Sequence, residues 1–234
     1  MKIAIMQPYF CPYIGYWQLI NAVDIFVLYD NIQFEKQGWM RRNRILVNGQ
    51  EKLFTIPIMK DSDYLDVRER RLSDDYLVEA EKILRMISAS YKKAPFYETA
   101  YPVIEQCFLN RESKNLFEYI YQSIKKICSY LGIETKIIIS SQIEMNHDLK
   151  NKYRVMEICH KLQADSYINP SGGVDLYSKE EFSEQGIKLQ FLKAKLSSYQ
   201  QFSKEFVPAL SIIDLMMFLS KEELQKQLLE YDLL

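Results

Sequence analysis

The sequence predicts an α/β protein with three layers, in which helices cover both faces of a mostly parallel sheet. Near the start of the chain, the apolar runs Ile3–Ile5 and Ile25–Tyr29 flank a stretch, Ile14–Val23, whose apolar residues have helical spacing. Two strands joined by one helix over so short a span form a parallel pair. Strands and helices alternate again after residue 136, as they do when a sheet is covered on both faces.

A β-hairpin is expected after a polar, aromatic loop that spans residues 31–43. Residues 44–58 contain Asn48-Gly49, the pair preferred in a two-residue type I′ turn, where both central residues need positive φ. This pair therefore places the turn and predicts two antiparallel strands on either side of it.

The next region, from about residue 76 to residue 131, has the apolar spacing of helices. Pro95 and Pro102 predict breaks in this pattern, and Gly132 is placed to end the last helix. We expect a helical insertion over residues 76–131 that packs over one edge of the sheet, within a single domain of residues 1–234.

The rest of the chain completes the alternation of strands and helices. The strands are expected at Lys136–Ser140, Ser166–Asn169 and Ile187–Leu192, and the helices at Tyr153–Leu162, Lys179–Glu184, Leu210–Phe218 and Lys221–Leu229.

Composition excludes several classes of protein. Of the 234 residues, 48% are hydrophobic and 26% are charged, which is typical of a globular chain rather than a disordered one. The formal net charge of −1 lacks the basic excess of most nucleic-acid-binding proteins. No apolar run approaches the roughly 20 residues of a membrane span, and the first strand leaves no room for a signal peptide. We expect a cytoplasmic protein with no membrane partner.

Cysteines and histidines do not predict a metal centre. The four cysteines are far apart in the sequence, and the two histidines are not near a cysteine pair; these residues are Cys11, Cys107, Cys128, Cys159, His147 and His160. Free, buried thiols are the expected state, and no metal is expected. The sequence leaves the cofactor unknown.

The loop after the first strand is the first candidate binding site. Ligands of parallel sheets bind beyond the carboxyl ends of the strands, and the helix that follows would offer free N–H groups to an anion. Gly15 would let a ligand approach the backbone, and tyrosines would offer flat faces and hydroxyls to a sugar or base. The candidate substrate-binding residues here are Gln7, Tyr9, Tyr13, Gly15 and Tyr16.

Two further groups of residues follow other strands. Asp30 ends the second strand, where it would either accept a proton from an attacking amine or bind sugar hydroxyls, and Asn169 ends a later strand; both are candidate catalytic residues. Guanidinium groups suit a pyrophosphate, and Trp39 offers a face for stacking. The other candidate substrate-binding residues are Lys36, Gln37, Trp39, Arg42, Asn43, Arg44, Gly172 and Gly173.

Several strings of residues together resemble the WbqC-like family, and the resemblance covers nearly the whole chain. They are Met6-Gln7-Pro8-Tyr9-Phe10, Pro12-Tyr13-Ile14-Gly15-Tyr16-Trp17, Lys36-Gln37-Gly38-Trp39, Arg42-Asn43-Arg44, Tyr167-Ile168-Asn169 with Gly172-Gly173, and Leu210-Ser211-Ile212-Ile213-Asp214. The chain departs from the family pattern at Asn151-Lys152-Tyr153-Arg154, which puts a role for residues 151–153 in doubt.

The resemblance implies work on a nucleotide-activated sugar in the biosynthesis of bacterial surface polysaccharides such as O-antigen lipopolysaccharide. It implies an N-acyl or N-aminoacyl transferase, with glycyl as one example of the group, acting on an amino-deoxy sugar. The donor stays open, and aminoacyl-tRNA is one candidate.

A fainter resemblance links the first strand and loop to nucleotidyl-transferase-type folds, which carry a His-x-Gly-His motif there. In this chain Tyr13 and Tyr16 stand in place of the two histidines. Their absence argues against activation of ATP, while leaving nucleotide binding open.

Two other functions remain open, a glycosyltransferase and a non-catalytic binding protein for nucleotide sugars. The first usually needs an Asp-x-Asp metal site, and Asp61-Ser62-Asp63 falls in a loop without a supporting strand. The oligomeric state is also open, because the apolar helix Leu210–Phe218 suits either the core or the interface of a homodimer.

Overall fold

A computed structural model describes residues 1–234 and contains a six-stranded sheet in the order β5-β2-β1-β6-β7-β8. Five of the strands are parallel, and β8 pairs antiparallel with β7. The predicted α/β class with a mostly parallel sheet is therefore confirmed. The strands are β1 (Lys2–Met6), β2 (Ile25–Leu28), β5 (Lys136–Ile139), β6 (Ser166–Pro170), β7 (Lys188–Ala194) and β8 (Tyr231–Leu233).

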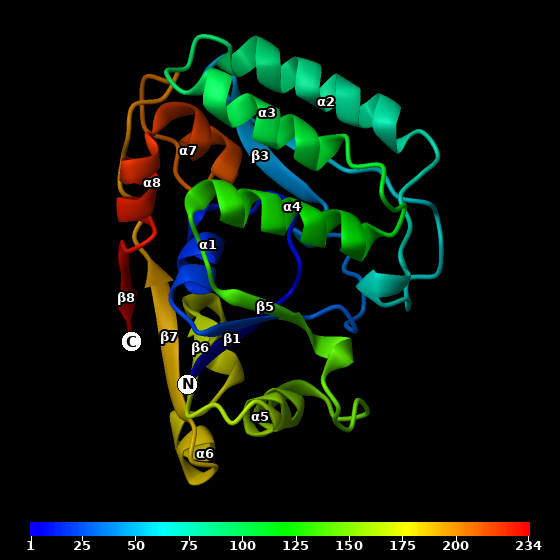
Figure 1. The fold of residues 1–234 in the computed structure, drawn as a ribbon, viewed down its shortest axis with the longest axis vertical. Helices are drawn as coiled ribbons and strands as arrows, with labels where there is room; N and C mark the ends of the chain where they lie inside the picture. Colours follow the sequence, from blue (N-terminus) through cyan, green and yellow to red (C-terminus); the bar gives the residue numbers. More distant parts are fainter.

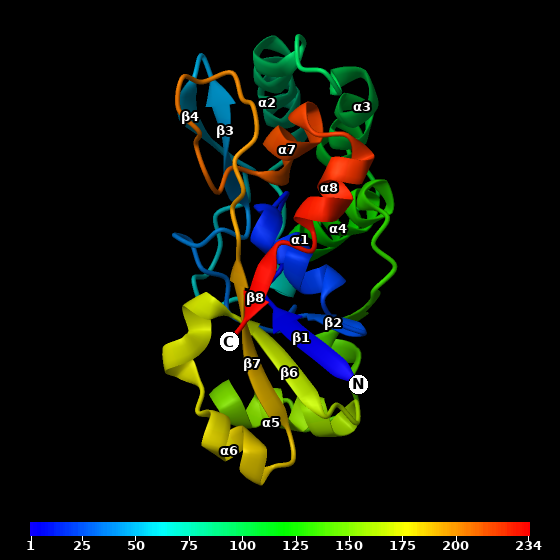
Figure 2. The ribbon, with the colours of Figure 1, turned by 90° about the vertical axis from the view of Figure 1, so that its left-hand side faces the viewer.

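Helices cover both faces of the sheet, as Figures 1 and 2 show. Because side chains alternate along a strand, Ile3 and Ile5 pack on one face with α5 (Asn151–Lys161) and α6 (Lys179–Glu184). Ala4 points to the opposite face, where it joins the core around α1 (Ile14–Asn21). The apolar strands are thus buried on both sides, as a parallel sheet requires.

A group of helices lies beyond α1, on the side of the sheet away from α5 (Figure 1). They share one hydrophobic core with α1 and with the β3–β4 hairpin. The helices are α2 (Tyr76–Tyr91), α3 (Tyr97–Phe108), α4 (Leu116–Leu131), α7 (Ile212–Phe218) and α8 (Lys221–Gln227).

The predicted break at Pro102 is wrong, because Pro102 lies inside α3. A proline within a helix removes one backbone hydrogen bond, and packing in the shared core offsets that loss. The chain breaks instead over residues 109–115, where the Asn115 side chain accepts a hydrogen bond from the Glu118 N–H and so begins α4. Gly132 ends α4 in the left-handed conformation, as predicted.

The hairpin consists of β3 (Arg42–Val47) and β4 (Gln50–Thr55), a slightly earlier span than the predicted 44–58. Asn48 and Gly49 have φ values of 53° and 76°, which agree with the predicted turn.

The apolar helix α7 belongs to the core, since all seven of its residues are buried. Its Asp214 carboxylate accepts hydrogen bonds from the Tyr91 hydroxyl at 2.7 Å, the Tyr199 hydroxyl at 2.7 Å and Gln201 Nε2 at 2.9 Å. Among all the helices of the chain, none combines the length and the apolar character needed to cross a membrane.

Candidate functional site

The strand order creates a crevice between β1 and β6. From β1 the chain proceeds to β2 on one side, whereas β6 pairs with the other side of β1. Open α/β sheets bind ligands beyond the carboxyl ends of the strands at such a reversal. A cavity of about 860 Å³ lies there, within the roughly 300–1,000 Å³ typical of small-molecule sites. We call it the main cavity.

Five of the predicted site residues line the main cavity: Gln7, Tyr9, Asn169, Gly172 and Gly173. It is also lined by residues that the sequence did not single out, which come from the segments after β2, β4 and β6 and from the start of α5. These include Tyr29, Asn31, Glu35, Asp66, Lys150, Arg154 and Tyr177.

Asn169 has a fixed amide orientation. Its Oδ1 accepts a hydrogen bond from the Tyr167 hydroxyl at 2.9 Å, and its Nδ2 donates to the Pro170 carbonyl at 3.2 Å. An amide nitrogen carries two hydrogens, so one N–H remains for a ligand. A Cβ built on Gly173 would come within 2.1 Å of Asn169 Nδ2, which is why this position needs glycine. Gly172 has open space around it.

Arg154 brings a cation to the main cavity from the first turn of α5. Its guanidinium lies over the Tyr29 ring, 4.8 Å from the ring centroid, and Nη1 donates to the Asn31 carbonyl at 3.2 Å. Nε and Nη2 are buried without any hydrogen-bond partner.

Burial raises the pKa values of Tyr9 and of the partly buried Asp66. Burial, with smaller contributions from Glu35 and Tyr13, raises the pKa of Tyr9 to about 12. Tyr9 therefore stays protonated at neutral pH, and its hydroxyl donates to Gln7 Oε1 at 3.1 Å. Partial burial also raises the pKa of Asp66, although the Arg68 cation 3.6 Å away opposes the rise, and the raised pKa makes this carboxylate a stronger proton acceptor.

A smaller cavity of about 210 Å³ adjoins the main cavity, because Tyr9 lines both. Four more predicted residues meet in it: Tyr13, Trp39, Asn43 and Arg44. The Trp39 ring lies 5.5 Å from the guanidinium carbons of both Arg42 and Arg44. Arg44 also pairs with Glu51 at 2.6 Å, so its charge is partly neutralised by the hairpin itself.

Lys36, Gln37 and Arg42 line neither of these two cavities. Lys36 pairs with Asp63 at 2.6 Å, and the Arg42 guanidinium donates to the Gln37 carbonyl. The predicted cations therefore do not line one cavity together: Arg42 and Arg44 both lie beside the Trp39 ring, Lys36 pairs with Asp63 on the loop, and Arg44 also has an acidic partner.

Gly15 and Tyr16 hold the first loop in position through their contacts with Tyr13 and Gln7. A Cβ on Gly15 would meet the Tyr13 ring at 2.6 Å, so the missing side chain makes room for Tyr13 rather than for a ligand. Tyr16 is buried, and its hydroxyl donates to the Gln7 carbonyl at 2.9 Å. These contacts hold Gln7 and Tyr9 at the edge of the main cavity.

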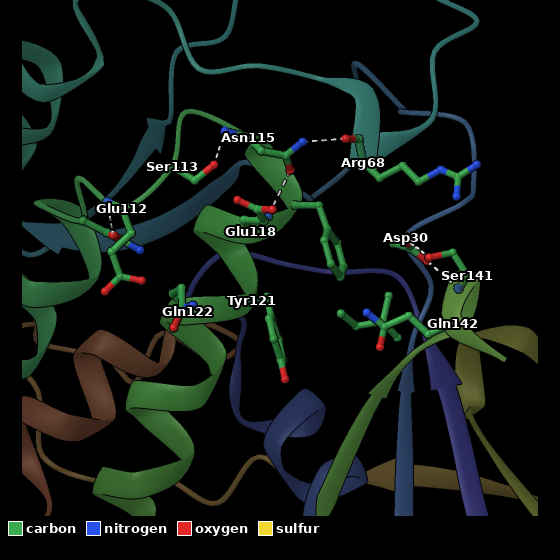
Figure 3. Close-up of a pocket in the computed structure, with 13 residues that line it drawn as sticks. Asp30, Arg68, Glu112, Ser113, Asn115, Glu118, Tyr121, Gln122, Ser141 and Gln142 are labelled. Carbon is green, nitrogen blue, oxygen red and sulfur yellow. Dashed lines mark hydrogen bonds between the residues drawn. The ribbon is translucent and has the colours of Figure 1, made fainter.

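Asp30 lines a third cavity, of about 540 Å³, between α4 and the ends of β2 and β5 (Figure 3). Its carboxylate accepts hydrogen bonds from the Ser140 hydroxyl at 2.8 Å, the Ser141 N–H at 2.9 Å and the Ser141 hydroxyl at 2.6 Å. Asp30 and Asn169, the two predicted catalytic residues, thus lie in different cavities.

A wall of two chain segments separates the third cavity from the main one. The Val67 N–H donates to the Ile32 carbonyl at 2.9 Å, and the Arg68 N–H donates to the Asp30 carbonyl at 3.2 Å. Asn31 and Asp66 line the main cavity, whereas Asp30 and Arg68 line the third, and Arg68 Nε lies 3.6 Å from Asp66 Oδ2. No group of three His, Cys, Asp or Glu side chains is placed to hold a metal ion.

Comparisons with known proteins give a family for the chain. It is 28% identical over 217 residues to the uncharacterized protein Rv1507c of Mycobacterium tuberculosis, a match that covers 92% of each chain. No solved structure matches it. The model of the WbqC-like protein family matches residues 7–226, which include every residue that lines the third and the smaller cavity and all but Ile5 and Met6 of the main cavity. The chain belongs to the WbqC-like protein family, as its motifs suggested.

Proposed function

We propose that this protein is an N-acyl or N-aminoacyl transferase that forms an amide on a nucleotide-linked amino-deoxy sugar. The observation that carries the proposal is the main cavity at the reversal of strand order, where an oriented amide, carboxylates and tyrosine rings converge. Tyr9, Tyr29 and Tyr177 offer flat faces to a sugar or base, and the smaller cavity extends the site past Tyr9.

The reaction needs positioning, polarisation of a carbonyl and removal of one proton. The sugar amine attacks the carbonyl carbon of an activated donor; the new C–N bond forms as the donor's ester, thioester or acyl-phosphate bond breaks. The free N–H of Asn169 stabilises negative charge on the carbonyl oxygen. Asp66, whose pKa is raised by burial, accepts the proton lost by the amine and returns it to the departing oxygen or sulfur. No covalent intermediate with the protein is required.

The test is a transfer assay with the purified protein and a dTDP-linked amino sugar. Candidate donors are glycine with ATP, aminoacyl-tRNA and acyl-CoA, and the readout is the mass gain of the sugar nucleotide. Asn169→Ala should reduce the rate about 100-fold, as loss of one donor to a developing oxyanion does. Gln50→Ala, an exposed amide on the hairpin, serves as the matched control and should leave the rate unchanged.

Other outcomes identify the alternatives. Binding of the sugar nucleotide without a mass gain from any donor would contradict the proposal and favour a binding protein. Sugar transfer that depends on manganese would favour a glycosyltransferase. The Asp-x-Asp metal site of a glycosyltransferase would have to be Asp61 and Asp63. Both residues are exposed, and Asp63 pairs with Lys36.

A further inference from the structure

The guanidinium of Arg154 is incompletely paired, although it is shielded from water. Nε carries one hydrogen and Nη2 carries two, and neither nitrogen has a hydrogen-bond partner in the protein. The ten ion pairs of the chain do not include Arg154, so no carboxylate neutralises it directly. Four other arginines of the chain also have a buried Nε without a partner, but only in Arg154 does Nη2 lack one as well. Burying a charged group without partners is costly.

The rest of the guanidinium is held in place. Tyr29 packs against one face, and Nη1 is engaged by the Asn31 carbonyl. Nε and Nη2 lie on the same side of the planar group, so their N–H bonds form a parallel pair. That edge matches two oxygen atoms of one carboxylate or one phosphate, the geometry in which arginine binds anions most strongly.

The surroundings of Arg154 define the kind of ligand further. Lys150, just before α5, brings a second positive charge to the main cavity, while Glu35 and Asp66 bring two negative ones, of which that of Asp66 also pairs with Arg68 at 3.6 Å. A ligand with an anionic group and an amine would satisfy both sets of charges. A nucleotide-linked amino sugar has both, and so does a free amino acid.

From these observations we infer that Arg154 is a ligand-binding residue, whose Nε–Nη2 edge receives a phosphate or carboxylate group in the main cavity. The inference rests on the proposed function only for the choice of probes. Arg154 lies in a helix and not at the end of a strand, so the sequence did not predict it as a site residue.

The experiment measures binding to the purified, full-length protein by calorimetry, without any turnover. The probe for the phosphate arm is dTDP, and the probe for the carboxylate arm is glycine. Arg154→Gln should weaken binding of one probe about tenfold or more, the usual effect of losing a charge-assisted hydrogen-bonded pair. Arg154→Lys, which keeps the charge but loses the two-pronged edge, should recover only part of the affinity.

Arg85→Gln is the matched control, because Arg85 is an exposed arginine on α2 and its nearest acidic partner is 3.8 Å away. It should bind the probes as the wild type does. The melting temperature of each variant without ligand is the second readout. Arg154→Gln should leave it unchanged or raise it, since the unpaired charge is removed, whereas a purely structural arginine would lower it when lost.

Two results would overturn the inference. One is binding of both probes by Arg154→Gln within twofold of the wild type. The other is no binding of either probe by the wild type at millimolar concentration. Anion binding that depends on Arg154, without acyl transfer from any donor, would retain this inference and contradict only the proposed function.

Discussion

Two adjacent glycines follow β6, and the space around them differs. A Cβ on Gly173 would collide with the Asn169 amide at 2.1 Å, whereas a Cβ on Gly172 would meet nothing within 4 Å. Neither glycine has a positive φ, so alanine brings no backbone strain at either position. The difference between them therefore isolates the orientation of Asn169.

We expect Gly173→Ala to displace the Asn169 amide, to lower stability by about 1–3 kcal/mol and to reduce transfer more than its stability loss explains. Gly172→Ala is the matched control and should remain within about 0.5 kcal/mol of the wild type. Urea unfolding and the transfer assay measure the two effects. Equal transfer rates in both alanine variants would contradict a role for the Asn169 orientation.

Asp214 in the core predicts a dependence of stability on pH. Burial raises its pKa in the folded protein, although hydrogen bonds from Tyr199, Tyr91 and Gln201 partly oppose the rise. The folded state then binds the proton more tightly than the unfolded state. Its contribution to stability is present below the unfolded pKa of about 3.8 and is lost as the pH rises through the folded pKa.

Urea unfolding between pH 3.5 and pH 6 tests whether the pKa of Asp214 is raised in the folded protein. The free energy of unfolding of the wild type, minus that of Asp214→Asn, should decrease as the pH rises across this window. Subtracting the variant removes the titration of the other carboxyl groups, which both proteins share. A difference that stays constant or increases with pH would contradict the raised pKa.

At the scale of elements, Ser211 connects the first loop to α7. Its hydroxyl donates to the Cys11 carbonyl at 2.6 Å and accepts from the Ile213 N–H at 3.3 Å, which begins the helix. The Asn43 side chain donates to the same carbonyl at 2.7 Å. Cys11 has a φ of 45°, unusual for a residue other than glycine, so these bonds hold a strained part of the loop.

We expect Ser211→Ala to cost about 1 kcal/mol as a lost helix cap and also to loosen residues 7–13. Ser220→Ala is the matched control, because Ser220 caps α8 by accepting from the Glu223 N–H and its side chain makes no hydrogen bond to the loop. Both variants should lose similar stability. Only Ser211→Ala should show faster hydrogen exchange in residues 7–13, and equal exchange in the two would refute the connection.

The buried elements were predictable from the sequence for a simple reason. The run Ile3–Ile5 is apolar because it is buried on both faces, and Asn48-Gly49 specifies its turn locally. β8 is a short edge strand, Tyr231–Leu233, with exposed residues and no apolar run to mark it. The break predicted at Pro102 was wrong, because packing in the shared core decides where α3 ends, and local sequence patterns do not reveal that packing.

The site was predictable only in part, since strand ends follow from local pattern but side-chain directions do not. The rule for strand ends brought Gln7 and Asn169 to one cavity. The same rule placed Asp30 at this edge of the sheet, yet its side chain turns toward Ser140 and Ser141 in another cavity. Arg154 reaches the site from α5 by lying over the ring of Tyr29, the residue after β2, a contact between distant parts of the sequence.

For the whole molecule, the wall between the main and third cavities separates Asp30 from the proposed chemistry. We expect Asp30→Asn to lower the free energy of unfolding by about 1–3 kcal/mol, because the amide nitrogen cannot accept the bonds that the carboxylate accepts. Transfer per folded molecule should remain close to that of the wild type, whereas Asn169→Ala loses it. Circular dichroism gives the folded fraction for both variants.

The opposite result would assign the third cavity to the reaction. If Asp30→Asn abolished transfer while the protein stayed folded and still bound dTDP, the amine would have to be activated on the far side of the wall. The segments of Asn31–Gln33 and Asp66–Arg68 would then have to separate during turnover, since their backbone hydrogen bonds close the passage between the cavities. Intact transfer in Asp30→Asn instead confines the reaction to the crevice between β1 and β6.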